Sequence, residues 1–300
     1  MPALPVNPER SILLHGVDFT SAPRSKKGIT IASGYLTGDV FHLHTLSTLC
    51  DFQSFADWLA LPGPWLGAFD FPFSFPRALV QQLNWPEQWA PLIAHVATLS
   101  RANLREQFKA VCDARPVGSK FLHRATDLIA NSSSSMKWVN PPVAYMLHAG
   151  APMLLEAGVS LPLMHAGDNQ RIALEGYPGM VARSITRASY KNDARAMQTP
   201  ERFAAREAIV KAIAAGDYPQ RITLHAGQHR QALLDDGSGD LLDAALCGLL
   251  AAWAWQRRDR NFGLPAAGFD PLEGWIVGAI DDVEDSNKDT GPRFSSGRQS

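Results

Sequence analysis

Acidic side chains stand at positions in this 300-residue sequence where a buried carboxylate would have a chemical use. Asp18 closes the apolar segment SILLHGVDFT (residues 11–20), and Asp70 lies near the end of WLGAFDF (residues 65–71). Each segment has the short apolar run of a buried strand. A single acid at the end of such a strand is either a turn residue or a metal ligand, and both interpretations stay open for each.

Asp240 and Asp243 lie three residues apart at the start of DLLDAALCGLLAAWAWQ (residues 240–256), an apolar stretch that predicts a buried helix. Residues at this spacing share one helix face. Acids in a first turn also complement the helix dipole, and Asp240 could cap the helix, so both interpretations stay open for Asp240. For Asp243, which lies a turn deeper, we favour a functional role, because burying an ionised acid is costly unless it is paired or metal-bound.

Glu175 closes a further strand-like run, RIALEG (residues 171–176), and carries the same ambiguity as the strand-end aspartates. Acids at two strand ends and on a buried helix together require a cation. Such a cluster would hold one or two Mg²⁺ or Mn²⁺ ions through carboxylate oxygens. Two ions about 3.5–4 Å apart would activate a water and stabilise the leaving oxygen in the cleavage of a phosphodiester.

The elements that must position these acids begin with three β-rich segments, at residues 11–20, 28–35 and 40–46. The turn signals between them predict an antiparallel meander. A short amphipathic helix, capped by Asp51 or Ser54, follows, and residues 65–71 predict a fourth strand. A helix between the third and fourth strands permits a parallel return beside the first strand, which would make Asp18 and Asp70 neighbours.

The chain between residues 72 and 163 changes character, because it is rich in proline, aromatic residues and helical patterns. We expect a helical insertion here, with an exposed loop around residues 118–137, where four serines follow one another. Residues 171–176 and 274–280 again have the composition of strands. A helix with proline at its start and glycine after it is predicted for residues 200–215. We expect one α/β domain over residues 1–280, and a disordered tail over residues 281–300.

The β-β-β-α-β order, with an acid on the first and fourth strands and a late Asp-x-x-Asp helix, resembles the ribonuclease H-like superfamily, and the late helix is similar to that of RuvC-type resolvases. Five segments together resemble domain-of-unknown-function family 429 more closely: GVDFT, GAFDFPFSFP, HRATD, ALEGYP and GDLLDAALCGLLAAW. Members of that family are described as predicted nucleases of this fold. The resemblance spans residues 11–280 and implies a mixed five-stranded sheet flanked by helices, with the insertion after strand four.

The resemblance implies a role for each acid. Asp18 would be the central ligand that bridges both metals, Asp70 would take the fourth-strand role, and Asp243 the late-helix role with Asp240 as a helper. Glu175 has no fixed counterpart; it would either supplement Asp70 or orient a basic residue. The implied catalytic residues are thus Asp18, Asp70, Glu175 and Asp243, and the implied ligands of Mg²⁺ or Mn²⁺ are Asp18, Asp70, Asp240 and Asp243.

The formal net charge of −1 predicts no global attraction to nucleic acid, so a surface for DNA or RNA must be local. Residues 99–140 hold seven Lys or Arg against three acids, and residues 183–195 hold four against one. A basic rim around an acidic centre suits a phosphate backbone. The candidate substrate contacts are Arg124, Lys137 and Lys191, although these charges could equally be solvated helix faces, and Arg124 could pair with Asp127 at i,i+3.

Other classes of function have less support. Three scattered cysteines and the lack of a long apolar run favour the reducing cytoplasm and no membrane association. Phosphate-binding loops, GxGxxG after a strand and GxSxG are absent, so ATPase, Rossmann and serine hydrolase functions are disfavoured. The main prediction is a metal-dependent nuclease. The alternative is a binding module that keeps the fold and its acids without catalysis; a phosphotransferase of the actin-like relatives has least support.

Overall fold

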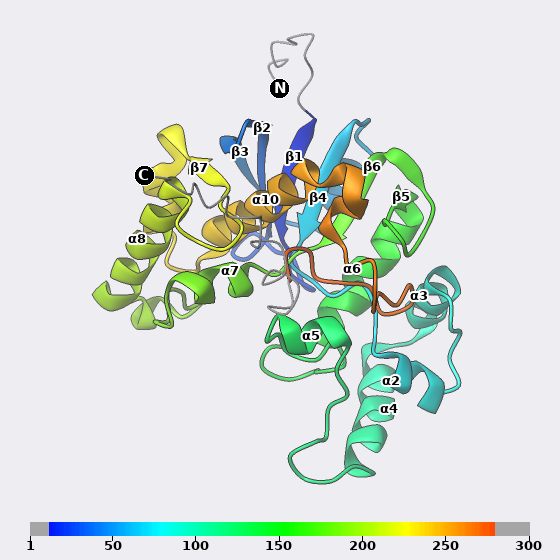
Figure 1. Cartoon of the computed structure of the whole chain (residues 1–300). Coiled ribbons are helices and arrows are strands. Elements are labelled where there is room, and N and C mark those ends of the chain that lie inside the picture. Colours follow the sequence, from blue (N-terminus) through cyan, green and yellow to red (C-terminus); the bar gives the residue numbers. More distant parts are fainter. Residues whose placement is uncertain (1–11, 280–300) are drawn as a thin grey trace, which may run out of the picture.

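A single mixed sheet forms the centre of the molecule in the computed structural model, which describes residues 12–279 (Figure 1). Its seven strands run in the order β5-β6-β4-β1-β2-β3-β7. Their bounds are Leu13–Asp18 (β1), Ile29–Thr37 (β2), Val40–Leu49 (β3), Trp65–Phe69 (β4), Val159–Ser160 (β5), Asp168–Glu175 (β6) and Thr223–His225 (β7).

The predicted β-β-β-α-β order is confirmed. β2 pairs antiparallel with both β1 and β3, the helix α1 (Phe52–Leu59) follows, and β4 returns parallel to β1. β6 then adds parallel to β4. The carboxyl ends of β1, β4 and β6 therefore meet at one edge of the sheet, which is where their acidic residues were expected.

The prediction of five strands is wrong for the described residues, because β5 and β7 extend the sheet to seven. These strands have two and three residues, too short for a hydrophobic period to show in the sequence. The strand expected at residues 274–280 is not formed within the described part, residues 274–279. Only Ile276 makes a parallel bridge, to Glu175, because Gly274 and Gly278 have positive φ angles that interrupt an extended chain.

Helices cover both faces of the sheet. On one face lie α10 (Asp240–Gln256), α7 (Pro178–Ile185), α8 (Pro200–Ala215) and the short α9 (Arg230–Asp235), which pack on residues such as Leu14 and Leu66. Figure 1 shows α10 crossing β1 and β4 on this face. The opposite face, with Val17 and Phe69, is covered by α1 and the insertion. Side chains of successive strand residues thus point to opposite faces of the sheet and pack in two separate hydrophobic cores.

The helical insertion after β4 is confirmed. It contains α2 (Arg77–Gln82), α3 (Trp89–Thr98), α4 (Arg101–Asp113), α5 (Ala125–Ile129) and α6 (Val143–Ala157). The prediction of an exposed loop around residues 118–137 is wrong in part. The helix α5 forms within this segment, and Arg124, Asp127 and Ser135 are buried. The charges of Arg124 and Asp127 are paired with each other inside the protein rather than solvated by water.

Within residues 12–279, none of the helices has the length and apolar character needed to cross a lipid bilayer. The tail predicted for residues 281–300 lies outside the described residues.

Candidate metal centre

Three aspartates from distant parts of the chain converge at the carboxyl edge of the sheet. Asp18 ends β1, Asp70 directly follows β4, and Asp243 lies in the first turn of α10. One carboxylate oxygen of each lies within 4.8 Å of the others. We call Asp18, Asp70 and Asp243 the aspartate cluster. Its convergence confirms the expectation that these three side chains lie close enough to share one ion.

The two strand-end aspartates are neighbours because of the parallel pairing of β1 and β4. Val17 lies opposite Phe69, and the backbone N–H of Asp70 donates to the carbonyl oxygen of Val17 at 2.8 Å. This bond continues the ladder one step beyond β4 and ties the backbone of Asp70 next to Asp18. Asp18 is buried, whereas Asp70 is partly exposed.

Asp243 reaches the same point because α10 packs against β1 with no side chain between them. A β-carbon on Gly16 would lie 2.0 Å from the carbonyl oxygen of Ala244. Asp243 itself is fully buried, and its position in the first turn of the helix favours a negative charge. Thirteen of the 17 residues of α10 are buried, so the core fixes the helix that carries this carboxylate.

The side chains of Tyr190 and Lys191 both contact Asp243. The Tyr190 hydroxyl donates to Oδ1 of Asp243 at 2.5 Å, and the Lys191 ammonium group forms an ion pair with Oδ2. Burial by itself would lower the pKa of Lys191, but the charge of Asp243, with smaller contributions from Asp18 and Asp70, holds that pKa well above its usual range. Among the residues that the structure describes, Lys191 is therefore the one whose positive charge contacts the aspartate cluster.

When all three aspartates of the cluster are ionised, they carry more negative charge than the single ammonium group of Lys191 balances. Burial, followed by Asp243, Asp240 and Asp70, raises the pKa of Asp18 well above its usual range. Burial is also the largest cause that raises the pKa of Asp70 to about 7, and the opposing effect of Lys191 is not enough to cancel it. A site of three oxygen donors with surplus negative charge fits a hard divalent cation such as Mg²⁺ or Mn²⁺.

Asp240 does not belong to the group of three. Lys27, in the turn between β1 and β2, donates to Oδ1 of Asp240 at 2.8 Å and to Asp193 at 2.6 Å. Asp240 lines the same cavity as Asp18, however, and its charge contributes to the raised pKa of Asp18. The role of Asp240 as a metal ligand stays a prediction.

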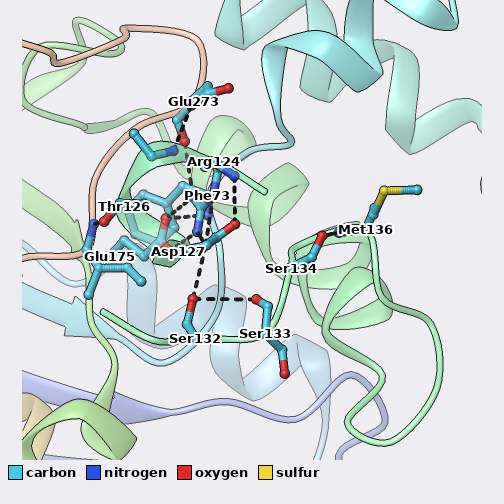
Figure 2. A network of polar contacts seen from close by, with 12 residues as sticks. Phe73, Arg124, Thr126, Asp127, Ser132, Ser133, Ser134, Met136, Glu175 and Glu273 are labelled. Carbon is cyan, nitrogen blue, oxygen red and sulfur yellow. Dashed lines mark hydrogen bonds and ion pairs between the residues drawn. The ribbon is translucent and has the colours of Figure 1, made fainter. Parts of the chain in front are cut away.

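Glu175 ends β6 but is bound to a basic residue. Arg124 donates to its two carboxylate oxygens at 2.6 and 2.7 Å, and the backbone N–H of Phe73 donates to it at 3.0 Å (Figure 2). Of the two roles that the sequence leaves open for Glu175, this geometry matches the one in which it orients a basic residue. Its catalytic role stays a prediction.

Figure 2 shows Arg124 as the centre of a buried network. Besides Glu175, its guanidinium donates to Asp127 at 2.8 Å and to the backbone carbonyl of Glu273 at 3.0 Å. This is the i,i+3 pairing with Asp127 that competes with the substrate-binding interpretation, and Arg124 is only 1% exposed. The network joins the insertion, β6 and the segment around residue 273, so it holds together the walls beside the aspartate cluster.

A cavity of about 680 Å³ opens above the aspartate cluster. Asp18, Asp70 and Lys191 line it, and the insertion contributes residues that include Pro142 and Met146. This size is in the range of small-molecule and cofactor sites. Asp18 and Asp70 are therefore reachable by a ligand from solvent, whereas the fully buried Asp243 is not among the cavity-lining residues.

The predicted substrate contacts are placed differently from one another. Lys191 lies at the cavity and touches the aspartate cluster, and Arg124 lines the cavity although its guanidinium is fully paired. Lys137 is partly buried in the loop before α6 and is not among the cavity-lining residues. All three substrate contacts stay predictions.

Three residues of the site were not singled out from the sequence: Lys27, Tyr190 and Arg183. Arg183 lines the cavity and donates to the Tyr177 hydroxyl at 2.9 Å. The basic segment at residues 183–195 was a signal for Arg183, and Tyr190 stands directly before Lys191. Nothing around Lys27 in the sequence marks it, because its partner Asp240 is 213 residues away.

Fold and site define an α/β protein with one mixed seven-stranded sheet and a buried three-aspartate group at the carboxyl edge of its central strands. Comparison of the chain with models of protein families, with curated proteins and with solved structures finds no match.

Proposed function

We propose that this protein is a metal-dependent phosphodiesterase that acts on nucleic acid, with a site of the ribonuclease H-like type. The observation that carries the proposal is the convergence of Asp18, Asp70 and Asp243 within 4.8 Å. Support also comes from the resemblance of the β-β-β-α-β order and the late Asp-x-x-Asp helix to that superfamily, and of the quoted segments to domain-of-unknown-function family 429.

The aspartate cluster would hold one or two Mg²⁺ or Mn²⁺ ions through its carboxylate oxygens. Such ions, when bound, supply Lewis-acid activation of a water and stabilisation of the oxygen that leaves the phosphorus. The chain itself supplies the orientation of the ligands. The backbone bond from Asp70 to Val17 fixes the main chain that carries the Asp70 carboxylate, and the hydroxyl of Tyr190 holds the carboxylate of Asp243.

Basic side chains at the cavity would bind the phosphate groups of the substrate. Lys27, Arg183 and Lys191 all line the cavity, and Lys191 also forms an ion pair with Asp243. Lys and Arg contacts to phosphate give affinity without reading sequence. With its net charge of −1, the protein would attract nucleic acid at this site and not over its whole surface.

A second candidate function is a binding module that keeps the aspartates for structure, without catalysis. The observation that favours it is the ion pair of Lys191 with Asp243, because a side-chain ammonium group already neutralises part of the cluster. In that case Mn²⁺ would neither bind nor raise the melting temperature.

Cleavage of labelled single- and double-stranded DNA and RNA with Mg²⁺ or Mn²⁺ tests the proposal. We expect Asp18→Asn to lower the rate by more than about 100-fold, since the loss of a residue that merely supports a metal ligand lowers activity by about 10–100-fold. Asp113→Asn is the matched control, because Asp113 pairs with Lys109 on the exposed side of α4. Equal cleavage by the wild type and Asp18→Asn would rule the proposal out.

A further inference from the structure

The segment that carries Lys191 is anchored on both sides. The buried guanidinium of Arg206 donates to the carbonyl oxygen of Tyr190 at 2.7 Å. On the other side, the backbone N–H of Asn192 donates to the carbonyl oxygen of Gly237 at 3.0 Å. The backbone at Lys191 is thus held in place by α8 and by the turn before α10.

The aliphatic stem of Lys191 is directed along the start of α10. Gly239, the residue before the helix, has a φ of 79°, and a β-carbon there would lie 2.7 Å from Cβ of Lys191. Both the positive φ and this close approach require glycine. The stem therefore runs against the first turn of the helix and brings the ammonium group to Asp243.

Both carboxylate oxygens of Asp243 already have a protein donor. The Tyr190 hydroxyl lies on Oδ1, and the Lys191 ammonium lies on Oδ2. A neutral hydroxyl can stay on one oxygen while a metal ion binds the other. An ammonium group cannot remain at contact distance on the oxygen that a divalent ion needs, because two positive charges at a few ångströms repel each other strongly away from bulk water.

We propose that Lys191 is the resident counter-cation of the aspartate cluster, and that a divalent ion binds by displacing its ammonium group from Asp243. The inference rests on the proposed function, since it takes the cluster to be a divalent-cation site. The side chain of Lys191 is 43% exposed and lines the cavity, so the displaced ammonium group has room to turn into it. There it would meet the phosphate of a substrate, which couples metal binding to substrate binding.

The affinity for Mn²⁺, measured by calorimetry on the full chain, tests this competition. Because Lys191→Met removes the competing charge, we expect the dissociation constant for Mn²⁺ to fall by at least about tenfold. Lys27→Met is the matched control, since Lys27 is the other cavity lysine but is paired with Asp240 and Asp193 outside the cluster. We expect a smaller change for Lys27→Met. An unchanged or weaker affinity in Lys191→Met overturns the inference.

A second measurement uses the wild-type protein and so does not depend on the folding of a variant. Amine acetylation, followed residue by residue with mass spectrometry, reports how free each lysine is. We expect saturating Mn²⁺ to increase the labelling rate of Lys191 several-fold. The rate of Lys109, which pairs with Asp113 on the exposed surface of α4, should stay unchanged. A labelling rate of Lys191 that stays constant or falls with Mn²⁺ contradicts the displacement.

The two proposals fail in different ways. If the wild type and Lys191→Met bind Mn²⁺ equally well, the displacement is wrong while the metal site stands. If neither protein binds Mn²⁺, both the displacement and the metal-dependent function are overturned. If Mn²⁺ binds to Lys191→Met more tightly but no nucleic acid is cleaved, the displacement is supported and the nuclease activity is rejected.

Discussion

A β-carbon on Gly16 of β1 would lie 2.1 Å from the backbone nitrogen of Gly248 in α10. Strand and helix therefore touch backbone to backbone at this crossing. The same contact brings the first turn of α10, with Asp243, to the end of β1, where Asp18 lies. The separation of these two carboxylates depends on a residue that has no side chain.

Gly16→Ala tests this dependence. The added methyl group has no space between two backbones, so we expect a loss of unfolding free energy of about 1–3 kcal/mol, as for other overpacked cores. Because the helix must shift to relieve the contact, Mn²⁺ affinity should fall as well, although no ligand is changed. Urea unfolding and calorimetry measure the two effects. A folded variant with unchanged Mn²⁺ affinity would show that the contact does not set the carboxylate geometry.

Some of this architecture could be predicted from local sequence signals. The helices over residues 200–215 and 240–256 have the bounds that were expected. For the first of them, Pro200 lies at the start, and Gly216, with a φ of 70°, ends it. The β-β-β-α-β order and the proximity of Asp18 and Asp70 also followed from the pattern, because strand-end acids on parallel neighbours lie at one edge of a sheet. Asp243 was expected to join them because an ionised acid in an apolar helix needs a partner or a metal.

The hydrogen-bond and ion-pair partners of individual side chains could not be predicted where the two residues lie far apart in the sequence. Glu175 looked like the other strand-end acids, and only the fold shows that Arg124, 51 residues earlier, is bound to it. The serine-rich segment around residue 132 indicated an exposed loop, because serines and charges are usually solvated. Burial of Arg124 depends on β6 and on Glu273, neither of which lies near it in the sequence.

Removing a carboxylate of the aspartate cluster should remove the stabilisation by metal. A ligand that binds only the folded state at 100 times its dissociation constant adds about 2.7 kcal/mol to the free energy of unfolding. We expect Mn²⁺ at that excess to raise the melting temperature of the wild type by several degrees, and to have no effect on Asp243→Asn. Differential scanning calorimetry measures both. Asp113→Asn, the surface control, should respond as the wild type does.

The stability of the metal-free protein should fall as the pH rises from about 5 to about 8. Asp70 has a pKa raised to about 7 in the folded state, compared with its ordinary value of 3.8, so between these values the folded protein binds more protons than the unfolded chain. The free energy of unfolding therefore decreases with pH through this window, and the raised pKa of Asp18 acts in the same direction.

Urea midpoints at both pH values, with a chelator present, measure this slope. Asp70→Asn cannot ionise at that position, so we expect a shallower decrease than in the wild type. Saturating Mg²⁺ should also flatten the decrease, because a bound cation favours the ionised carboxylates. An equal slope in the wild type and in Asp70→Asn would assign the pH dependence to other groups.

The buried network of Arg124 should contribute far more to stability than an exposed ion pair of the same chemical type. Arg124→Met leaves the carboxylates of Asp127 and Glu175 buried without their partner, and removal of one member of a buried pair lowers stability by about 3–5 kcal/mol. Arg77→Met is the matched control, because Arg77 pairs with Glu87 and Asp270 at the surface. The backbone N–H of Arg77 also donates to Glu273, and the substitution keeps this bond. We therefore expect Arg77→Met to lower the free energy of unfolding by about 1 kcal/mol or less.

The double variant Arg124→Met with Glu175→Gln separates the ion pair from the packing around it. The amide that replaces the carboxylate of Glu175 carries no charge, so one of the two uncompensated acids is removed, and we expect the double variant to be more stable than Arg124→Met alone. Denaturant midpoints of the wild type, both single variants and the double variant complete the thermodynamic cycle. Additive losses would mean that Arg124 and Glu175 stabilise the wall of the cavity independently, and that their ion pair is not what joins the insertion to β6.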